Sequence, residues 1–382
     1  MNTILGLLID WVLALALWVE QWVTPRLLSK TGRDNPRVRH IVGGLGYYAR
    51  AYRATLPNVR KWLASRAELF PAVLQVQTIN RCNARCPMCP YPHTIHLQER
   101  EVMEDALYSK IVAECAGETD LLDFVPMSKN EPLLDVKLEA RIAEFKAVAA
   151  PHQMVEIVTN GSGLTPGRFN RLAESGVDLI TISMSAHTEA TYGKVMAGLS
   201  WRQVMKNLGA LATTDIPNVN IFLRFIRQQD NVSELKAFTK SWRKFNILAF
   251  DVNNRSGTVR NYGRMALAKN SFIHWFRRLL GRRAYLVCPY VFSIAHVLQN
   301  GDVPMCANDW HNREVLGNVR EQSIREIYNS PRIQEIRELM RQGRYEEIAP
   351  CRECSFWKDW LQQLEGGKHN ERKLAVVTSV GK

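Results

Sequence analysis

The middle of the chain alternates between two hydrophobic periods. Short apolar runs typical of β-strands recur at 74–80, 121–128, 154–160, 179–185, 219–226 and 247–253. Segments with helical periodicity occur at 104–115, 136–149, 166–175, 188–196, 202–212 and 232–245. Strands that alternate with helices predict βα units and a parallel sheet, an α/β fold. In βα barrels the functional groups lie at the C-terminal ends of the strands.

The N-terminal pattern is different, because residues 4–23 are nearly all apolar, with the acidic residues Asp10 and Glu20 as interruptions. At about 100° per residue, the polar positions fall in one narrow sector of a helix. A second face gathers Trp11, Trp18 and Trp22. A polar stripe beside tryptophan-rich faces suits the membrane interface, whereas an acidic residue is costly in a lipid-exposed span. A helix that caps the barrel or contacts a second subunit is the alternative.

The net charge of +13 is concentrated beside this helix. Ten basic residues lie within 24–66, against the single acid Asp34. Such a flank favours anionic lipid on the cytoplasmic leaflet, and we expect the basic-apolar stretch 272–283 on the same surface. No nucleic-acid-binding motif accompanies the charge, which favours a membrane surface over nucleic acid as the partner. A cleaved signal peptide is disfavoured, because no positive region precedes the apolar run.

Three of the eight cysteines, Cys82, Cys86 and Cys89, have C-x3-C-x2-C spacing directly after the first strand-like run. They are close enough in sequence to share one [4Fe–4S] cluster, and three ligands leave one iron open. Structural zinc is the alternative, although paired CxxC elements are its usual pattern.

A second set consists of Cys288, Cys306, Cys351 and Cys354, and no cysteine follows it. Four thiolates suffice for one fully ligated cluster, with a four-cysteine zinc site as the alternative. Cys115 lies in a helical pattern and is interpreted as a small buried hydrophobe. Cysteines grouped at cluster spacing indicate a reducing compartment rather than disulfides, so we expect the catalytic part in the cytoplasm, at the inner face of the membrane.

Residues 81–90, RCNARCPMCP, resemble the signature of the radical S-adenosylmethionine (SAM) superfamily. The resemblance implies a partial (β/α)6 barrel over 71–265, in which the open iron binds SAM and a 5′-deoxyadenosyl radical is formed. The second set is similar to the SPASM/twitch extension in its single-cluster form, which implies an auxiliary [4Fe–4S] domain over 284–365. We expect a membrane-facing segment at 1–70 and a polar tail at 366–382.

The resemblance also implies SAM contacts at Met88, Glu131, Asn160, Ser183 and Arg224. Met88 stands where an aromatic residue often contacts adenine. Glu131 matches the acid that pairs with the SAM ammonium, but Lys129 and Asn130 replace the two glycines that usually precede it. Asn160 belongs to a Thr-Asn-Gly turn, Ser183 matches a ribose-binding serine, and Arg224 suits the SAM carboxylate. Ordinary strand-end, turn and edge roles are the alternatives.

Twitch enzymes of this kind oxidise an alcohol to a ketone, with the auxiliary cluster as electron acceptor. The resemblance therefore implies a dehydrogenation of a small-molecule, saccharide or lipid-linked substrate, with a flavodoxin- or ferredoxin-type electron donor. Arg255, after the sixth strand-like run, is the candidate for substrate contact or proton handling. Radical modification of a ribosomal peptide and a non-catalytic iron–sulfur electron carrier are the alternatives.

Overall fold

The computed structural model describes residues 69–97, 101–213, 219–267, 288 and 290–356. Its larger sheet contains β1 (Val73–Val76), β2 (Asp123–Val125), β3 (Met154–Thr159), β4 (Leu179–Ser183), β5 (Asn220–Arg227), β6 (Asn246–Asp251) and β7 (Ile294–Val297). The order across the sheet is β6-β5-β4-β3-β2-β1-β7, and every pairing is parallel. The α/β fold and the six expected strands are confirmed. The seventh strand, β7, was not predicted.

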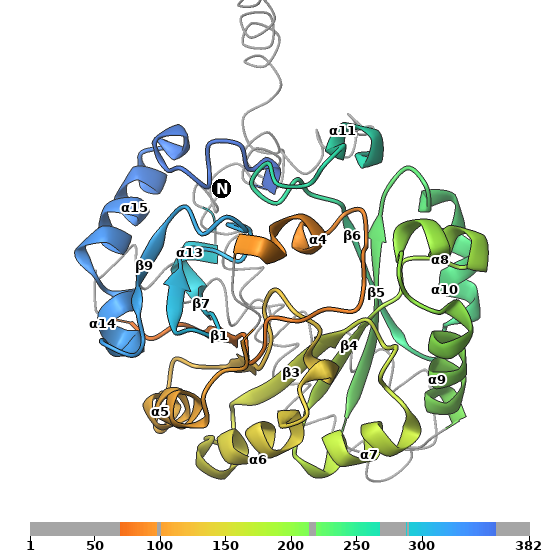
Figure 1. The fold of residues 1–382 in the computed structure, drawn as a ribbon, viewed down its shortest axis with the longest axis horizontal. Coiled ribbons are helices and arrows are strands. Elements are labelled where there is room, and N and C mark those ends of the chain that lie inside the picture. The colour runs from red at the N-terminus through yellow and green to blue at the C-terminus, as the bar shows by residue number, and fades with distance from the viewer. Residues whose placement is uncertain (1–68, 98–100, 214–218, 268–287, 289, 357–382) are drawn as a thin grey trace, which may run out of the picture.

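Helices cover one side of this sheet, and Figure 1 shows α5 to α10 as the outer layer around the curved row of strands. The helices are α4 (Tyr91–Thr94), α5 (Asp105–Cys115), α6 (Leu138–Val148), α7 (Pro166–Glu174), α8 (Glu189–Val195), α9 (Trp201–Thr213), α10 (Leu235–Ser241), α11 (Tyr262–Met265), α13 (Tyr290–Ser293), α14 (Ile324–Tyr328) and α15 (Pro331–Arg341). Short 3₁₀ turns are η3 (Ile95–Leu97), η4 (Pro132–Leu134), η5 (Val232–Glu234) and η6 (Tyr345–Glu347). The helix predicted at 232–245 was too long, because α10 ends at Ser241. A turn in which the Phe245 N–H donates to the Trp242 carbonyl leads directly into β6.

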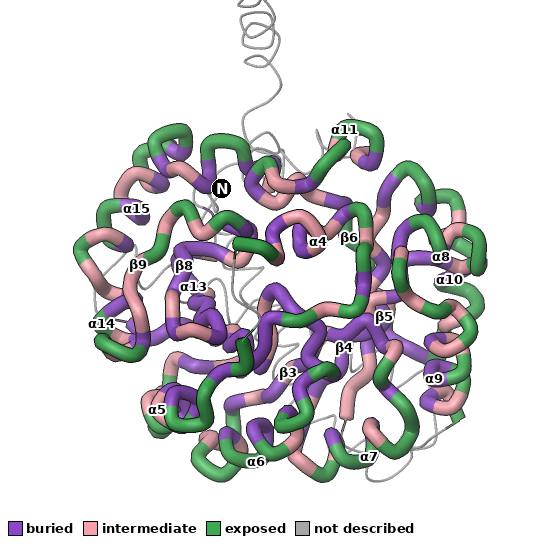
Figure 2. The backbone as a smooth tube through the Cα atoms, in the orientation of Figure 1, coloured by how far each residue is buried: buried purple, intermediate pink, exposed green. Residues whose placement is uncertain are grey.

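The outer face of the sheet forms the main core. Phe124 of β2 stacks on Phe145 of α6 at 4.1 Å between ring centroids and meets Tyr108 of α5 edge-on. The strand register aligns Leu74 and Val155 with Phe124, so all three project toward the helices. Cys115 is fully buried in α5, as expected. Figure 2 shows the same division, with buried strands inside and exposed outer helix surfaces.

The inner face changes from apolar to polar along the strands. Near the strand starts, Leu179, Phe222 and Leu248 form a separate buried cluster, with Met154 packed against it. Toward the strand ends, Ser183 and Arg224 lie opposite each other in the β4–β5 register. The apolar residues form a floor, so polar chemistry is confined to the C-terminal ends of the strands.

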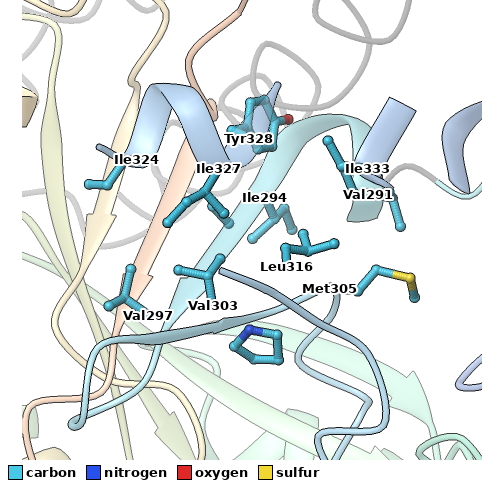
Figure 3. A pocket seen from close by; sticks show the side chains of 12 residues that line it. Val291, Ile294, Val297, Val303, Met305, Leu316, Ile324, Ile327, Tyr328 and Ile333 are labelled. Carbon is cyan, nitrogen blue, oxygen red and sulfur yellow. The ribbon is translucent and has the colours of Figure 1, made fainter. Parts of the chain in front are cut away.

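The C-terminal part adds β8 (Asp302–Pro304) and β9 (Val315–Asn318), which pair as an antiparallel hairpin. A cavity of about 10 Å³ lies between β7, this hairpin, α14 and α15, where Val297, Leu316 and Ile327 are among its lining residues (Figure 3). A space of about 10–15 Å³ holds at most one water, which needs polar partners. This apolar gap is therefore a packing feature and not a ligand site.

Several expectations fall outside the described residues. These are the N-terminal helix within 1–70, its basic flank, the stretch 272–283 and the tail 366–382. Among the residues that are described, no helix is long and apolar enough to cross a membrane.

Candidate functional site

The first cysteine set occupies the loop between β1 and α4. The loop turns tightly, because the Cys89 N–H donates to the Cys86 carbonyl at 3.0 Å. The Tyr91 hydroxyl accepts from the Cys82 N–H at 2.9 Å. All three thiol-bearing residues, Cys82, Cys86 and Cys89, are partly exposed. The loop backbone is therefore held in place while its cysteines stay accessible to a ligand.

Electrostatic coupling shows that these three thiols lie together. The pKa of Cys82 is raised to about 12, mainly by burial, with smaller contributions from Cys89 and Glu131 that a backbone hydrogen bond from Ala84 opposes. Burial also raises the pKa of Cys86, with contributions from both other thiols. For Cys89, burial raises the pKa, whereas the nearby Arg255 and Arg224 lower it. Thiols in this state lose their protons when they bind metal. Their convergence fits a metal cluster with three protein ligands.

Glu131 lies beside this loop and is only 3% exposed. Its Oε1 accepts from the Thr159 hydroxyl at 2.5 Å, and its Oε2 accepts from the Asn160 N–H at 2.7 Å. The Leu133 N–H also donates to Oε1, at 3.2 Å. Burial raises the carboxyl pKa, and these three hydrogen bonds oppose the shift. The fixed carboxylate keeps acceptor capacity for a further cationic donor.

Asn160 joins the third strand end to the cysteine loop. Its Nδ2 donates to Asn83 Oδ1 at 2.8 Å, and Asn83 Nδ2 donates to the Ser162 hydroxyl at 3.0 Å. The next residue, Gly161, has a φ of 77°, a conformation that glycine adopts without strain. The Thr-Asn-Gly turn therefore fixes both Glu131 and the loop that carries the first thiols.

Of the remaining expected SAM contacts, Arg224 and Ser183 lie near the cysteine loop, whereas Met88 lies in the hydrophobic core. Arg224 Nη2 donates to the Ser183 hydroxyl at 2.9 Å, and Arg224 lies close enough to Cys89 to lower its pKa. Arg224 and Ser183 thus meet the cysteine loop at the strand ends. Met88 is 6% exposed and belongs to the main hydrophobic core. Its contact with adenine stays a prediction.

The second cysteine set converges from three separate segments. Cys288 precedes α13, Cys306 follows β8, and Cys351 and Cys354 follow η6; their exposed fractions are 8%, 8%, 7% and 7%. Burial raises the pKa of Cys306 to about 12. The Cys351 pKa is raised by burial and then by all three other thiols. Four mutually coupled, buried thiols fit a fully ligated cluster.

Neither cysteine set is recognised as a site for a single metal ion. Within the described ranges, no three His, Cys, Asp or Glu side chains are grouped so that they could hold one metal ion. A four-iron cluster is larger than one ion and spaces its thiolates more widely.

The loop after β6 is hydrogen-bonded to the segment that carries Cys351 and Cys354, and we call these hydrogen bonds of Asn254 the clasp. Asn254 Nδ2 donates to the Glu353 carbonyl at 2.6 Å, and Asn254 Oδ1 accepts from the Ser355 N–H at 2.7 Å. The next three residues, Arg255, Ser256 and Gly257, have φ values of 45°, 55° and 81°. Left-handed backbone at a non-glycine residue costs about 1–3 kcal/mol and persists only where its surroundings impose it. The clasp imposes it here.

Arg255 lies between the two cysteine sets. Its Nη1 donates to Asn308 Oδ1 at 2.8 Å, and the Asn308 N–H donates to Cys306 Sγ at 3.4 Å. The same guanidinium lowers the pKa of Cys89. It also opposes the effect of burial, which raises the pKa of Tyr290 to about 12. Sequence reasoning selected Arg255 but missed Asn308, for which the position two residues after Cys306 was the available signal.

Two family matches agree with this geometry. The chain matches the family described as "Radical SAM superfamily" over residues 76–236 and the SPASM family, described as "Iron-sulfur cluster-binding domain", over residues 288–355. The first match contains the three cysteines of the β1–α4 loop, and the second contains the four converging ones.

Curated relatives are distant. The chain is 25% identical over 185 residues to a tungsten-containing aldehyde ferredoxin oxidoreductase cofactor-modifying protein of Pyrococcus furiosus, covering 47% of this chain and 51% of the relative. It is 25% identical to a PqqA peptide cyclase of Streptomyces rochei, covering 66% and 68% of the two chains. The chain thus spans about half the length of the first of these relatives.

Solved structures show the same fold. Streptococcus suis SuiB bound to its precursor peptide SuiA has a TM-score of 0.56 and 13% identity, covering 81% of this chain and 74% of SuiB. The structure of anSMEcpe with bound AdoMet has a TM-score of 0.53 and 15% identity, covering 71% and 84% of the two chains. The two matched domains imply a SAM-binding [4Fe–4S] cluster, SAM and an auxiliary cluster, and the two cysteine sets fit them. The chain thus combines a radical SAM domain, residues 76–236, with a SPASM-type iron–sulfur cluster-binding domain, residues 288–355.

Proposed function

We propose that this radical SAM enzyme oxidises its substrate by two electrons, as a dehydrogenase of a hydroxyl-bearing small molecule, saccharide or lipid-linked saccharide. The observation that carries the proposal is the place of Arg255. Its guanidinium lowers the pKa of Cys89 in the first set. It also donates to Asn308, whose N–H donates to Cys306 of the second set. A substrate group held by Arg255 therefore lies between a radical-generating site and a second redox site.

When bound, SAM and its cluster supply the 5′-deoxyadenosyl radical, and the fully ligated auxiliary cluster supplies an electron acceptor. The chain's own residues position the reactants. We assign Glu131 to the SAM ammonium, Arg224 to the SAM carboxylate and Ser183 to the ribose. Asn160 holds the turn beside the cofactor, and Met88 is assigned to the adenine.

Arg255 is assigned to the substrate oxygen. An arginine stays protonated in proteins, so it is a poor proton acceptor but a strong hydrogen-bond donor. Its bond to Asn308 Oδ1 uses Nη1 and fixes the guanidinium, which has further donors. We infer that these donors orient a hydroxyl and stabilise negative charge on its oxygen while solvent water accepts its proton.

The proposal is tested with the full chain, reconstituted anaerobically and supplied with reductant, SAM and a panel of polyols, saccharides and lipid-linked saccharides. We expect one substrate class to give a product two hydrogens lighter, with one 5′-deoxyadenosine for each product. The Arg255→Lys variant should lose at least ten-fold in product formation while retaining SAM cleavage without substrate. Product with an unchanged hydrogen count would overturn the oxidation. No 5′-deoxyadenosine under any condition would favour a non-catalytic electron carrier.

Modification of a ribosomal peptide is the second candidate, and the match to a PqqA peptide cyclase over 66% of the chain favours it. The same reaction mixture separates the two candidates. A cross-linked peptide in mass spectra, with no oxidised alcohol, would select the peptide reaction.

We also propose that the enzyme works at the cytoplasmic face of the membrane and receives electrons from a flavodoxin- or ferredoxin-type protein. The support for the membrane location is the apolar N-terminal pattern and its basic flank, and the electron donor follows from the need of an iron–sulfur enzyme for a reductant. Deleting residues 1–28 should release a protein that otherwise sediments with anionic liposomes, while SAM cleavage survives. Equal sedimentation of both forms would contradict membrane attachment through this segment.

A further inference from the structure

The sequence departs from the family pattern at Lys129, and the structure gives this residue a definite place. Lys129 follows β2 in the same loop as Glu131 and is only 4% exposed. Its Nζ donates to the Asp309 carbonyl at 2.6 Å and to Asn312 Oδ1 at 2.8 Å. It also lies 5.6 Å from the centre of the Trp310 ring. All three partners lie in the loop between Cys306 and β9.

The backbone of Lys129 is fixed from the sheet. Its N–H donates to Gln77 Oε1 at 3.1 Å, and Gln77 Nε2 donates to Gln299 Oε1 at 2.8 Å. Gln77 follows β1 and Gln299 follows β7. The lysine is thus held at the junction where β7 joins the barrel sheet.

The charges around Lys129 leave it as a cation beside the second cysteine set. Burial lowers its pKa to about 8, so it is mostly protonated at pH 7, and Asp309 and Cys306 favour the charged form. His296 of β7 is fully buried nearby, and burial lowers its pKa to about 3, so it is neutral.

The Asp309 carboxylate, also fully buried, has other partners. Its Oδ2 accepts from the Glu314 N–H at 2.9 Å, and its Oδ1 lies 3.5 Å from Arg313 Nε. The Lys129 ammonium binds the Asp309 backbone carbonyl rather than this carboxylate. Its positive charge is therefore not consumed by a direct ion pair with Asp309.

We propose that Lys129 is a positioning residue that joins the loop after β2, which carries Glu131, to the loop between Cys306 and β9. Its positive charge raises the reduction potential of the auxiliary cluster. A reduced cluster carries one more negative charge than an oxidised one. A buried cation stabilises that charge more than water-exposed groups do, because the local dielectric is low. Charge and hydrogen bonding near a cluster are established determinants of its potential. The inference depends on the auxiliary cluster but not on the substrate or the reaction.

The test is a redox titration of the reconstituted full chain at pH 7, followed by electron paramagnetic resonance, with the SAM-binding cluster as internal reference. The Lys129→Met variant keeps the length of the side chain and removes its charge, so we expect the auxiliary potential to shift to more negative values. The Asp309→Asn variant removes a charge of opposite sign and should shift it to more positive values. The control is Lys137→Met, because Lys137 is half-exposed and pairs with Asp105 at 2.6 Å on the helix side.

A potential that does not move in Lys129→Met with full iron content would overturn the proposal. Shifts of the same sign in Lys129→Met and Asp309→Asn would also overturn it, because a merely structural disturbance does not follow the sign of the removed charge. If Lys129→Met binds less than the full iron, Lys129→Gln is titrated instead. It retains a donor for Asp309 or Asn312 without the charge, and the same negative shift is required of it.

Discussion

The two cysteine sets differ in how they are assembled. The first set comes from one loop of eight residues, 82–89, and its three members are partly exposed. The second set comes from three segments that are far apart in sequence, and its four members are only 7–8% exposed. A site that must admit SAM needs an open position, whereas a site that stores electrons is best closed to solvent and ligands. The difference in exposure matches this division of roles.

The supports of the two sites differ in the same way. Local turns and the Asn160–Asn83 hydrogen bond of 2.8 Å hold the first loop. The second site depends on tertiary contacts, namely the addition of β7 to β1 and the clasp of Asn254 on Glu353 and Ser355. The second site should therefore be more sensitive to substitutions outside its own ligands.

Removing the ligands of each site gives the largest expected contrast. The wild type should bind two [4Fe–4S] clusters, about eight irons, after anaerobic reconstitution. Replacing Cys82, Cys86 and Cys89 with Ala should leave about four irons and abolish 5′-deoxyadenosine formation. Replacing Cys351 and Cys354 with Ala should remove the other cluster and leave SAM cleavage in place. Iron and sulfide analysis with a 5′-deoxyadenosine assay measures both.

One result would contradict the assignment of the second cysteine set to an iron–sulfur cluster. If the wild type binds about four irons and one zinc, the second set is a zinc site. The oxidation proposed here would then lack its electron acceptor.

The Glu131→Gln variant tests whether the first site binds SAM through this carboxylate. A charge-assisted hydrogen bond contributes about 1.5–3 kcal/mol, so SAM affinity should fall roughly ten-fold or more, with cluster content unchanged. Calorimetric SAM titration of the loaded protein measures this. Glu234→Gln is the matched control, because Glu234 also accepts backbone hydrogen bonds, from His187 at 2.6 Å and Thr188 at 3.2 Å, but serves the start of α8. Equal SAM affinity in Glu131→Gln and wild type would reduce Glu131 to a strand-end residue.

The difference between local and distant contacts also explains which features could be predicted from the sequence. Strands, helices and the first cysteine loop have local signals, namely hydrophobic period and close ligand spacing. The residues of β7 form a run of only four, and their pairing with β1 joins positions more than 200 residues apart. The contacts of Lys129 with the loop after Cys306, and of Asn254 with Ser355, are equally non-local. Such contacts follow from the folded arrangement and leave no periodic trace in the sequence.

The smallest expected effect tests the clasp at Gly257. Gly257 has a φ of 81°, and a Cβ there would clash with Glu353 Oε2 and lie 3.0 Å from Glu353 Cβ. The Gly257→Ala variant should therefore lose about 1–3 kcal/mol of stability from backbone strain, and the displaced Glu353 should loosen the auxiliary cluster. Thermal unfolding and iron content measure the two consequences. Gly193→Ala is the control, because Gly193 lies in α8 with nothing within 4 Å of an added Cβ. Alanine in a helix interior is more favourable than glycine by roughly 0.5–1 kcal/mol, so this variant should be stabilised. If Gly257→Ala instead equals the wild type in stability and retains both clusters, the β6 loop does not support the second site, and the dependence of that site on distant contacts must rest on β7 and on Lys129.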